Sequence, residues 1–151
     1  MSENDPYRVF VTHLFDGNED YQRVFEYLQS RDNFYFTACS NPENMPDAGG
    51  LQAMKDEFIS QIKPSEVVIM PVAMFELNSS LMRFQVDVAQ AHDLPVIGIK
   101  SFGETIAIKK EVIDCCNDII DWNDRAIINA VKRLGRNEDT SQWEVIEFDL
   151  D

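Results

Sequence analysis

The stretch "SEVVIMPVAM", residues 65–74, limits the possible folds of this chain more than any other feature. After its first two residues it is apolar throughout, and it lacks the alternation of apolar and polar side chains that marks a strand with one face in water. A run of this kind is typical of a parallel strand that helices cover on both faces. The chain is therefore expected to build an α/β fold around a buried parallel sheet.

Segments of strand type and helix type alternate along the chain. Strands are predicted at 7–15, 33–40, 65–74 and 95–100, with a short fifth strand within 114–122. Helices with one apolar face are predicted at 17–30, 51–64, about 80–92 and 123–134. This order predicts a flavodoxin-like three-layer α/β/α fold with a central, mainly parallel five-stranded sheet. The alternating segment 142–150 is expected to form a terminal strand or an arm.

Length and charge narrow the classes of protein. The 151 residues fit one domain at 1–151, with a core at about 7–134 and an acidic C-terminal tail at 135–151. The net charge of −14 disfavours nucleic acid and anionic membrane surfaces as partners. Neither a transmembrane run nor a signal region is recognised. The three cysteines have neither metal-type nor disulfide-type spacing, which favours a reduced, cytoplasmic protein without a metal site.

Ligands of such sheets bind at the carboxyl ends of the strands, but the common motifs for that edge are missing. The loop "THLFDGNEDY" after the first strand fits neither GxGxxG nor GxxxxGK[ST]. No GxSxG nucleophile motif is present, and no Asp ends the third strand. His13 and His92 lie on different elements, so a catalytic triad is not expected.

Four segments carry a resemblance to a known family. They are "RVFVTH", "LQAMKDEFISQIKPSEVVIMPVAMF", "VDVAQAHDLPVIGIKSFG" and "IIDWNDRAIINAVKRL". In this order and spacing they resemble the bacterial TIR-like proteins, relatives of the Toll/interleukin-1 receptor domain. The subgroup that they resemble most includes the TIR proteins of Thoeris anti-phage defence systems. The resemblance covers roughly residues 7–134.

The resemblance implies an activity and partners. Many TIR domains cleave the nicotinamide–ribose bond of NAD⁺, and some bacterial ones make an ADP-ribose-type signal that activates a defence effector. NAD⁺ or an ADP-ribose-type nucleotide is therefore the implied substrate or ligand, with no other cofactor. TIR–TIR self-association is a further implied contact. Two alternatives stay open: a catalytically silent TIR module that senses a nucleotide or assembles, and a nucleoside-processing transferase of similar fold.

Position 85 decides between these alternatives. The family's catalytic Glu follows a frequent Trp by four residues, and the matching positions here are Leu81 and Gln85. A glutamine keeps the shape and hydrogen bonding of Glu but lacks the charge that stabilises a developing positive ribose, so NAD⁺ glycohydrolase or cyclase activity is expected to be weak or lost. One alternative is that another acid, Glu76 or Asp87, compensates for the missing carboxylate. Another is that Gln85 is a Glu-to-Gln substitution that traps a ligand. A third is an ordinary glutamine that hydrogen-bonds the backbone of a neighbouring loop.

Further residues are expected to contact the nucleotide. They are Thr12, His13, Phe15, Met74, Ser79 and Leu81. His13 and Phe15 are expected to stack on a base or on nicotinamide, and Ser79 to contact ribose hydroxyls. The alternatives are a core-edge His13 and a helix N-cap made by Ser79 and Ser80. The loop 41–50 would be the family's lid or assembly contact, or a plain surface loop.

Overall fold

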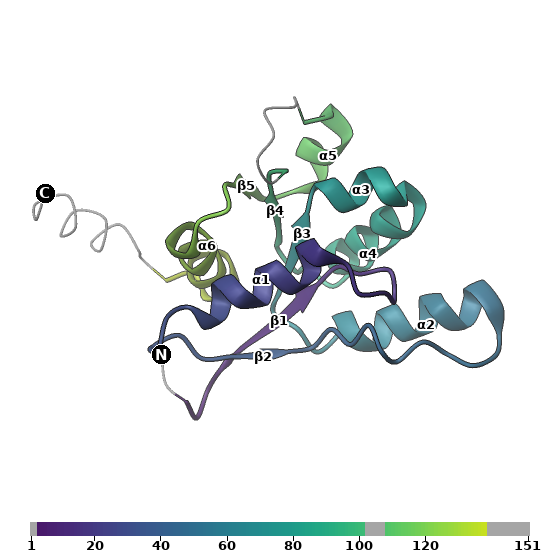
Figure 1. Cartoon of the computed structure of the whole chain (residues 1–151), viewed down its shortest axis with the longest axis horizontal. Coiled ribbons are helices and arrows are strands. Elements are labelled where there is room, and N and C mark those ends of the chain that lie inside the picture. Colours follow the sequence, from purple (N-terminus) through teal and green to yellow (C-terminus); the bar gives the residue numbers. More distant parts are fainter. Residues whose placement is uncertain (1–2, 102–107, 139–151) are drawn as a thin grey trace, which may run out of the picture.

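The fold is an open α/β sandwich, and the computed structural model describes residues 3–101 and 108–138 (Figure 1). Its five strands are all parallel, in the order β2-β1-β3-β4-β5. The strands are β1 Tyr7–Val11, β2 Phe36–Ala38, β3 Val67–Pro71, β4 Val96–Ile99 and β5 Asp118–Ile120. The helices are α1 Glu19–Gln29, α2 Gly50–Ile62, α3 Ala73–Leu77, α4 Ser79–Ala91, α5 Lys110–Cys115 and α6 Asp124–Arg136. The predicted flavodoxin-like fold class is confirmed.

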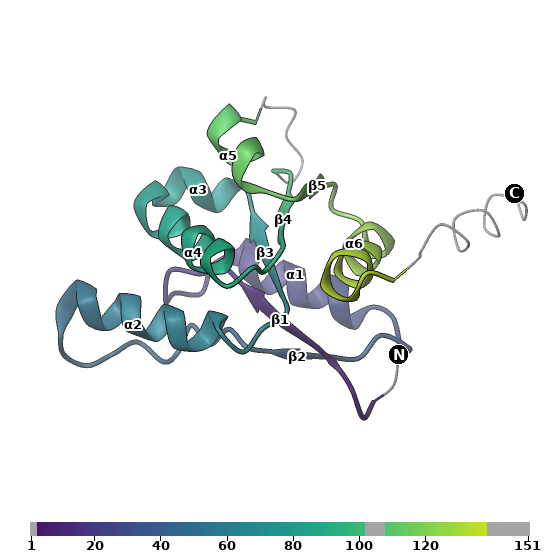
Figure 2. The ribbon, with the colours of Figure 1, turned by 180° about the vertical axis from the view of Figure 1, so that it is seen from behind.

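Two helical layers cover the sheet. Helices α1 and α6 lie on one face, and α2, α3, α4 and α5 lie on the other, as the two opposite views show (Figure 1 and Figure 2). The side chains of β3 alternate between these layers: Val67 and Ile69 join the cluster under α1 and α6, and Val68 and Met70 join the other. All five residues of β3 are buried, which explains why the sequence of this strand is continuously apolar.

Asparagine side chains cap three of the described helices at their starts. Asn18 caps α1 and Asn123 caps α6, since the side chain of each accepts hydrogen bonding from backbone N–H groups in the first turn of its helix. The expected cap of α4 by Ser79 and Ser80 is wrong. The Asn78 side chain accepts a hydrogen bond from the backbone N–H of Leu81 instead, at 3.1 Å, and the serines lie inside the helix.

Two short helices were not predicted. The run 65–74 was expected to be strand throughout, but the strand ends at Pro71 and Met74 lies in α3. Helix α5 takes up part of the segment 114–122 and ends at Cys115, so the fifth strand is shorter than that segment. Both helices are so short that they offer almost no periodicity to a sequence pattern. The predicted strand or arm at 142–150 lies outside the described residues.

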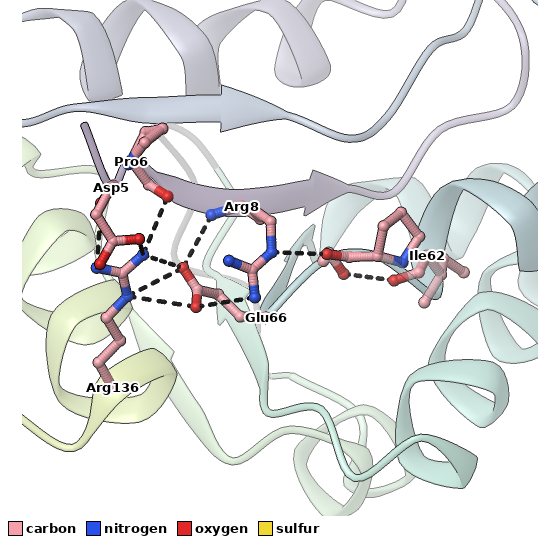
Figure 3. A network of polar contacts seen from close by, with 8 residues as sticks. Asp5, Pro6, Arg8, Ile62, Glu66 and Arg136 are labelled. Carbon is pink, nitrogen blue, oxygen red and sulfur yellow. Dashed lines mark hydrogen bonds and ion pairs between the residues drawn. The ribbon is translucent and has the colours of Figure 1, made fainter. Parts of the chain in front are cut away.

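The amino-terminal edge of the sheet is held by a network of charged groups around Arg136 (Figure 3). Arg136 Nη2 lies 2.9 Å from Glu66 Oε1, and Arg136 Nη1 lies 3.1 Å from Asp5 Oδ2. The guanidinium carbon lies 4.1 Å from the centre of the Tyr7 ring. Burial and the hydrogen bond from the Tyr7 hydroxyl to Glu138 raise the pKa of Tyr7. The network ties the start of the chain to β3 and to the end of α6.

Candidate functional site

The opposite edge of the sheet carries an open pocket. It lies between the loops that follow β1 and β2 and the start of α1. Its volume is about 710 Å³. The lining residues are Phe15, Asp16, Gly17, Tyr21, Gln22, Ser40, Asn41, Pro42, Glu43 and Met45. Open α/β sheets bind their ligands at this carboxyl edge.

Gln85 fastens the loop after β1 to helix α4. Its Oε1 accepts a hydrogen bond from the backbone N–H of His13 at 3.0 Å. Its Nε2 donates to the backbone carbonyl of His13 at 2.9 Å and to that of Leu81 at 3.2 Å. The side chain is fully buried. The amide therefore pairs with both polar groups of one residue, as a neighbouring strand would, at a point where the sheet has ended.

His13 links this loop to helix α2. Its Nε2 lies 2.8 Å from Gln61 Oε1, and its Nδ1 accepts a hydrogen bond from the backbone N–H of Phe15 at 3.2 Å. Because Nδ1 accepts, the neutral ring carries its proton on Nε2 and donates it to Gln61. Burial lowers the pKa of His13; the bond to Gln61 and the nearby carboxylates of Asp16 and Glu57 oppose that effect.

Gln61 is a second amide clamp, and it holds the loop after β2. Its Oε1 accepts from the backbone N–H of Asn41 at 2.9 Å, and its Nε2 donates to the carbonyl of Asn41 at 3.0 Å. Nε2 also donates to Glu57 Oε2 at 2.9 Å, and that oxygen accepts from Asn44 Nδ2 at 2.8 Å. The two loops that form the pocket are thus joined through His13 and Gln61, and Gln85 anchors the first of them to α4.

Most of the predicted site residues are buried inside the protein and do not line the pocket. Thr12, His13, Met74 and Gln85 are fully buried. The His13 ring packs against protein rings: Phe10, Phe15, Tyr21 and Phe58. Of the seven predicted residues, Phe15 is the one that lines this pocket. On α4, Ser79 is exposed and Leu81 is half-buried.

The two acids considered as substitutes for Glu are both at the surface. Glu76 is exposed and forms an ion pair with Lys109, with 3.4 Å between Nζ and Oε1. Asp87 is exposed and pairs with Arg83 one helical turn earlier, at 3.5 Å. Each carboxylate is thus held by a surface cation of its own.

Sequence patterns missed the polar groups of the pocket. Tyr21 lies on α1; its hydroxyl lies 3.0 Å from Ser40 Oγ, and burial raises its pKa. Phe15 adopts a left-handed backbone conformation with φ of 57°, which is uncommon for an aromatic residue and is held by the bond to His13. Asp16 and Glu43 add carboxylates at the rim. No local motif marks these residues, because three different segments supply them.

The pocket combines an aromatic ring, hydroxyls, amides and carboxylates. None of the described residues that line it is Lys or Arg. Such a lining suits sugar hydroxyls and a planar base better than a phosphate. Among the described residues no group of three His, Cys, Asp or Glu side chains could hold a metal ion. No family model matches this chain, and no match is found among curated proteins.

Proposed function

We propose that the chain is a TIR-like module of prokaryotic defence or signalling that binds NAD⁺ or an ADP-ribose-type nucleotide and does not cleave it. Three features support this proposal: the sequence resemblance over residues 7–134, the parallel five-stranded sheet, and a pocket at its carboxyl edge. The fold alone hosts many functions, so the pocket and position 85 carry the argument.

The observation that carries the proposal is the bonding of Gln85. Cleavage of a nicotinamide–ribose bond leaves positive charge on the ribose, and a catalytic carboxylate has to face that charge. The amide of Gln85 is neutral and faces the peptide groups of His13 and Leu81. It can shape the loop beneath a ligand, but it supplies no charge to a reaction. Binding without turnover is the expected result.

The lining of the pocket suggests how a nucleotide would lie. The ring of Phe15 offers a surface for a base or for nicotinamide. The Tyr21 and Ser40 hydroxyls and the Asp16 and Glu43 carboxylates offer acceptors for ribose hydroxyls. Since none of the described lining residues is a cation, the phosphates would point toward solvent.

A second candidate function rests on the same absence of positive charge in the lining. A nucleoside has no phosphate, and two carboxylates beside an aromatic ring are suited to bind and activate its sugar. A nucleoside-processing transferase of similar fold would therefore use Asp16 or Glu43. Such an enzyme would act on free deoxynucleosides and leave NAD⁺ intact.

Two measurements on the full chain test these proposals. Calorimetric titration with ADP-ribose and NAD⁺ is expected to show saturable binding, and chromatography is expected to show no nicotinamide release. Tyr21→Phe should weaken binding by about fivefold, the value of one neutral hydrogen bond. Tyr27→Phe is the matched control, because Tyr27 lies on the same helix and packs against Trp122, outside this pocket.

Other results would overturn parts of the proposal. Nicotinamide release by the unchanged chain would show that catalysis does not need a carboxylate at position 85. Turnover of deoxynucleosides without NAD⁺ binding would favour the transferase. If neither class of compound binds, and the chain forms concentration-dependent oligomers, an assembly module replaces the nucleotide sensor.

A further inference from the structure

Two adjacent cysteines bring their thiols together at the end of helix α5. Neighbouring side chains diverge in a regular helix or strand, so adjacent thiols rarely come into contact. Here the backbone changes between the two residues: Cys115 is the last residue of α5, and Cys116 is extended, with φ of −107° and ψ of 141°. The Cys116 thiol donates a hydrogen bond to the Cys115 sulfur. The end of the helix thus creates a dithiol, and neither residue lines the pocket at the carboxyl edge.

Strand β4 holds this dithiol in place. A Cβ atom at Gly98 would lie 3.0 Å from Cys116 Sγ, closer than an ordinary van der Waals contact, so the glycine leaves room for the sulfur. Asn117 ties the next residue to the same strand. Its backbone N–H donates to the carbonyl of Val96 at 2.7 Å, and its Oδ1 accepts from the N–H of Val96 at 2.8 Å.

The contact makes the two thiols chemically unequal. The hydrogen bond from Cys116 lowers the pKa of Cys115; burial opposes this effect, Arg83 on α4 adds to it, and Asp87 opposes it. The same hydrogen bond, together with burial, raises the pKa of Cys116. While it is protonated, the Cys115 thiol donates to the carbonyl of Val112 at 3.2 Å. Cys115 is therefore the nucleophile of the pair, and Cys116 is its proton-bearing neighbour.

Access to the two sulfurs is restricted. Cys115 is 6% exposed and Cys116 is half-buried. A small oxidant reaches such sulfurs more easily than a bulky one such as glutathione disulfide. We propose that Cys115 and Cys116 form a redox site that hydrogen peroxide oxidises to a disulfide between these two residues.

The reaction needs only the two thiols and the peroxide. The Cys115 thiolate attacks one peroxide oxygen, the O–O bond breaks, and hydroxide leaves and becomes water by taking up a proton. Cys115 is then a sulfenic acid. The Cys116 sulfur attacks the Cys115 sulfur, the S–O bond breaks, and water leaves with the proton of Cys116. Two thiols are oxidised to one disulfide, and one peroxide is reduced to two waters.

The product is expected to be easily reduced. Consecutive Cα atoms lie about 3.8 Å apart across a trans peptide, which is less than the roughly 4.4 Å at which disulfides usually begin. Because Asn117 fixes the chain directly after the pair, the backbone has little freedom to relieve this strain. Strained disulfides are the labile ones, so a dithiol reductant should restore both thiols.

The third cysteine, Cys39, is the matched control. It follows β2, whereas Cys116 packs on β4, and strands β1 and β3 lie between them. Three steps of about 4.8 Å separate these strands by roughly 14 Å, which is beyond the reach of a disulfide. Burial also raises the pKa of Cys39. Cys39 should therefore keep its thiol while the pair is oxidised.

The test treats the full chain with one equivalent of hydrogen peroxide, alkylates the remaining thiols and maps the tryptic peptides by mass. Peptide 111–125 should be unalkylated and lighter by two hydrogen atoms, and dithiothreitol should reverse the change. Cys116→Ser should leave a sulfenic acid on Cys115 that dimedone traps. Cys115→Ser should slow oxidation at this site by about tenfold or more, because the thiolate is lost. Cys39→Ser should change neither the rate nor the product.

Other results would overturn the proposal. They are a disulfide that includes Cys39, a disulfide between two chains, sulfinic acid on Cys115 without a disulfide, and equal rates for Cys115→Ser and Cys116→Ser. The peptide map of the unchanged chain needs no substitution, so it decides the matter even where a variant fails to fold. Thermal unfolding of each variant identifies such a failure.

Discussion

The sheet has an amino edge, where its strands begin, and a carboxyl edge, where they end. Different interactions hold these two edges together. At the amino edge, Arg136 joins the chain start, β3 and α6 through ion pairs with Asp5 and Glu66 (Figure 3). At the carboxyl edge, two buried neutral amides, Gln61 and Gln85, hold the loops after β1 and β2. Asp5 is largely exposed to water, whereas Gln85 is fully buried.

The difference follows from the hydrogen bonds that each group can make. A glutamine amide both donates and accepts, so it can pair with the N–H and the carbonyl of one residue without adding charge. A guanidinium only donates, so it collects carboxylates and carbonyls, and these contacts are screened by salt. The contacts at the carboxyl edge should therefore be insensitive to salt but should be lost when a substitution removes the amide donor. The contacts at the amino edge should weaken as the salt concentration rises.

The largest expected effect is that of Gln85→Glu. A carboxylate there would lose the donor to the carbonyls of His13 and Leu81 and would be buried without a cation, which costs about 3 kcal/mol or more of folding stability at pH 8. Burial would raise the pKa of the new carboxyl in the folded state. Stability would then be present at low pH, where the protonated acid can donate, and lost as pH rises through that value.

Urea unfolding at pH 5 and pH 8 measures this effect. Gln90→Glu is the control, because Gln90 lies on the same helix but is exposed and its amide makes one long hydrogen bond, 3.4 Å from Nε2 to the carbonyl of Cys115, so the change should cost only about 0.5 kcal/mol. A Gln85→Glu protein as stable as the parent at pH 8 would mean that the loop after β1 does not depend on the amide. The same variant also shows whether a carboxylate at this position restores nicotinamide release.

A smaller loss is expected for Arg136→Met. Methionine can keep the contact with the Tyr7 ring but removes the bonds to Asp5, Glu66 and the carbonyl of Pro6, at a cost of about 1 to 2 kcal/mol. Arg133→Met is the control at an exposed ion pair on the same helix, where about 0.5 kcal/mol is expected. Unfolding in 0.05 M and 1 M NaCl tests the comparison: the Arg136 difference should shrink in salt, and the Gln85 difference should not.

The fold could be predicted from the sequence because its signals are local and repeated. The continuous apolar run of β3, the one-faced helices and the caps at Asn18 and Asn123 each follow from a short stretch of sequence. Helices α3 and α5 were missed because five or six residues give no clear period. The α4 cap was misplaced because Asn78 and Ser79 are both good capping residues, and only geometry selects between them.

The sequence predicted that the candidate site lies at the carboxyl edge of the sheet, but it did not predict which side chains hold the loops there. The resemblance singled out position 85, whose role in a site stays a prediction, and the bonds of Gln85 match the alternative of a glutamine that hydrogen-bonds the backbone of a neighbouring loop. Gln61 gave no signal, because a polar residue near the end of an amphipathic helix normally faces solvent. Its bonds to Asn41 and His13 span 20 and 48 residues of sequence, and no local pattern contains such a pairing.

The smallest expected effect is a loss of stability below neutral pH caused by His13. Burial lowers the pKa of folded His13, with Gln61, Asp16 and Glu57 opposing that effect. As pH falls below the ordinary histidine value of about 6.5, the unfolded chain takes up a proton that the folded chain refuses, so stability decreases toward the lowered pKa. Protonation of Nδ1 would also remove the acceptor of the Phe15 N–H, which would loosen the pocket loop while the Arg136 network stays intact.

Urea unfolding at pH 7.5 and 5.5 should show this decrease in the parent and in His92→Gln, and a smaller one in His13→Phe. An imidazole of His13 that titrates at or above pH 6.5 by NMR would contradict it, and the carboxyl edge would then be no more sensitive to acid than the amino edge.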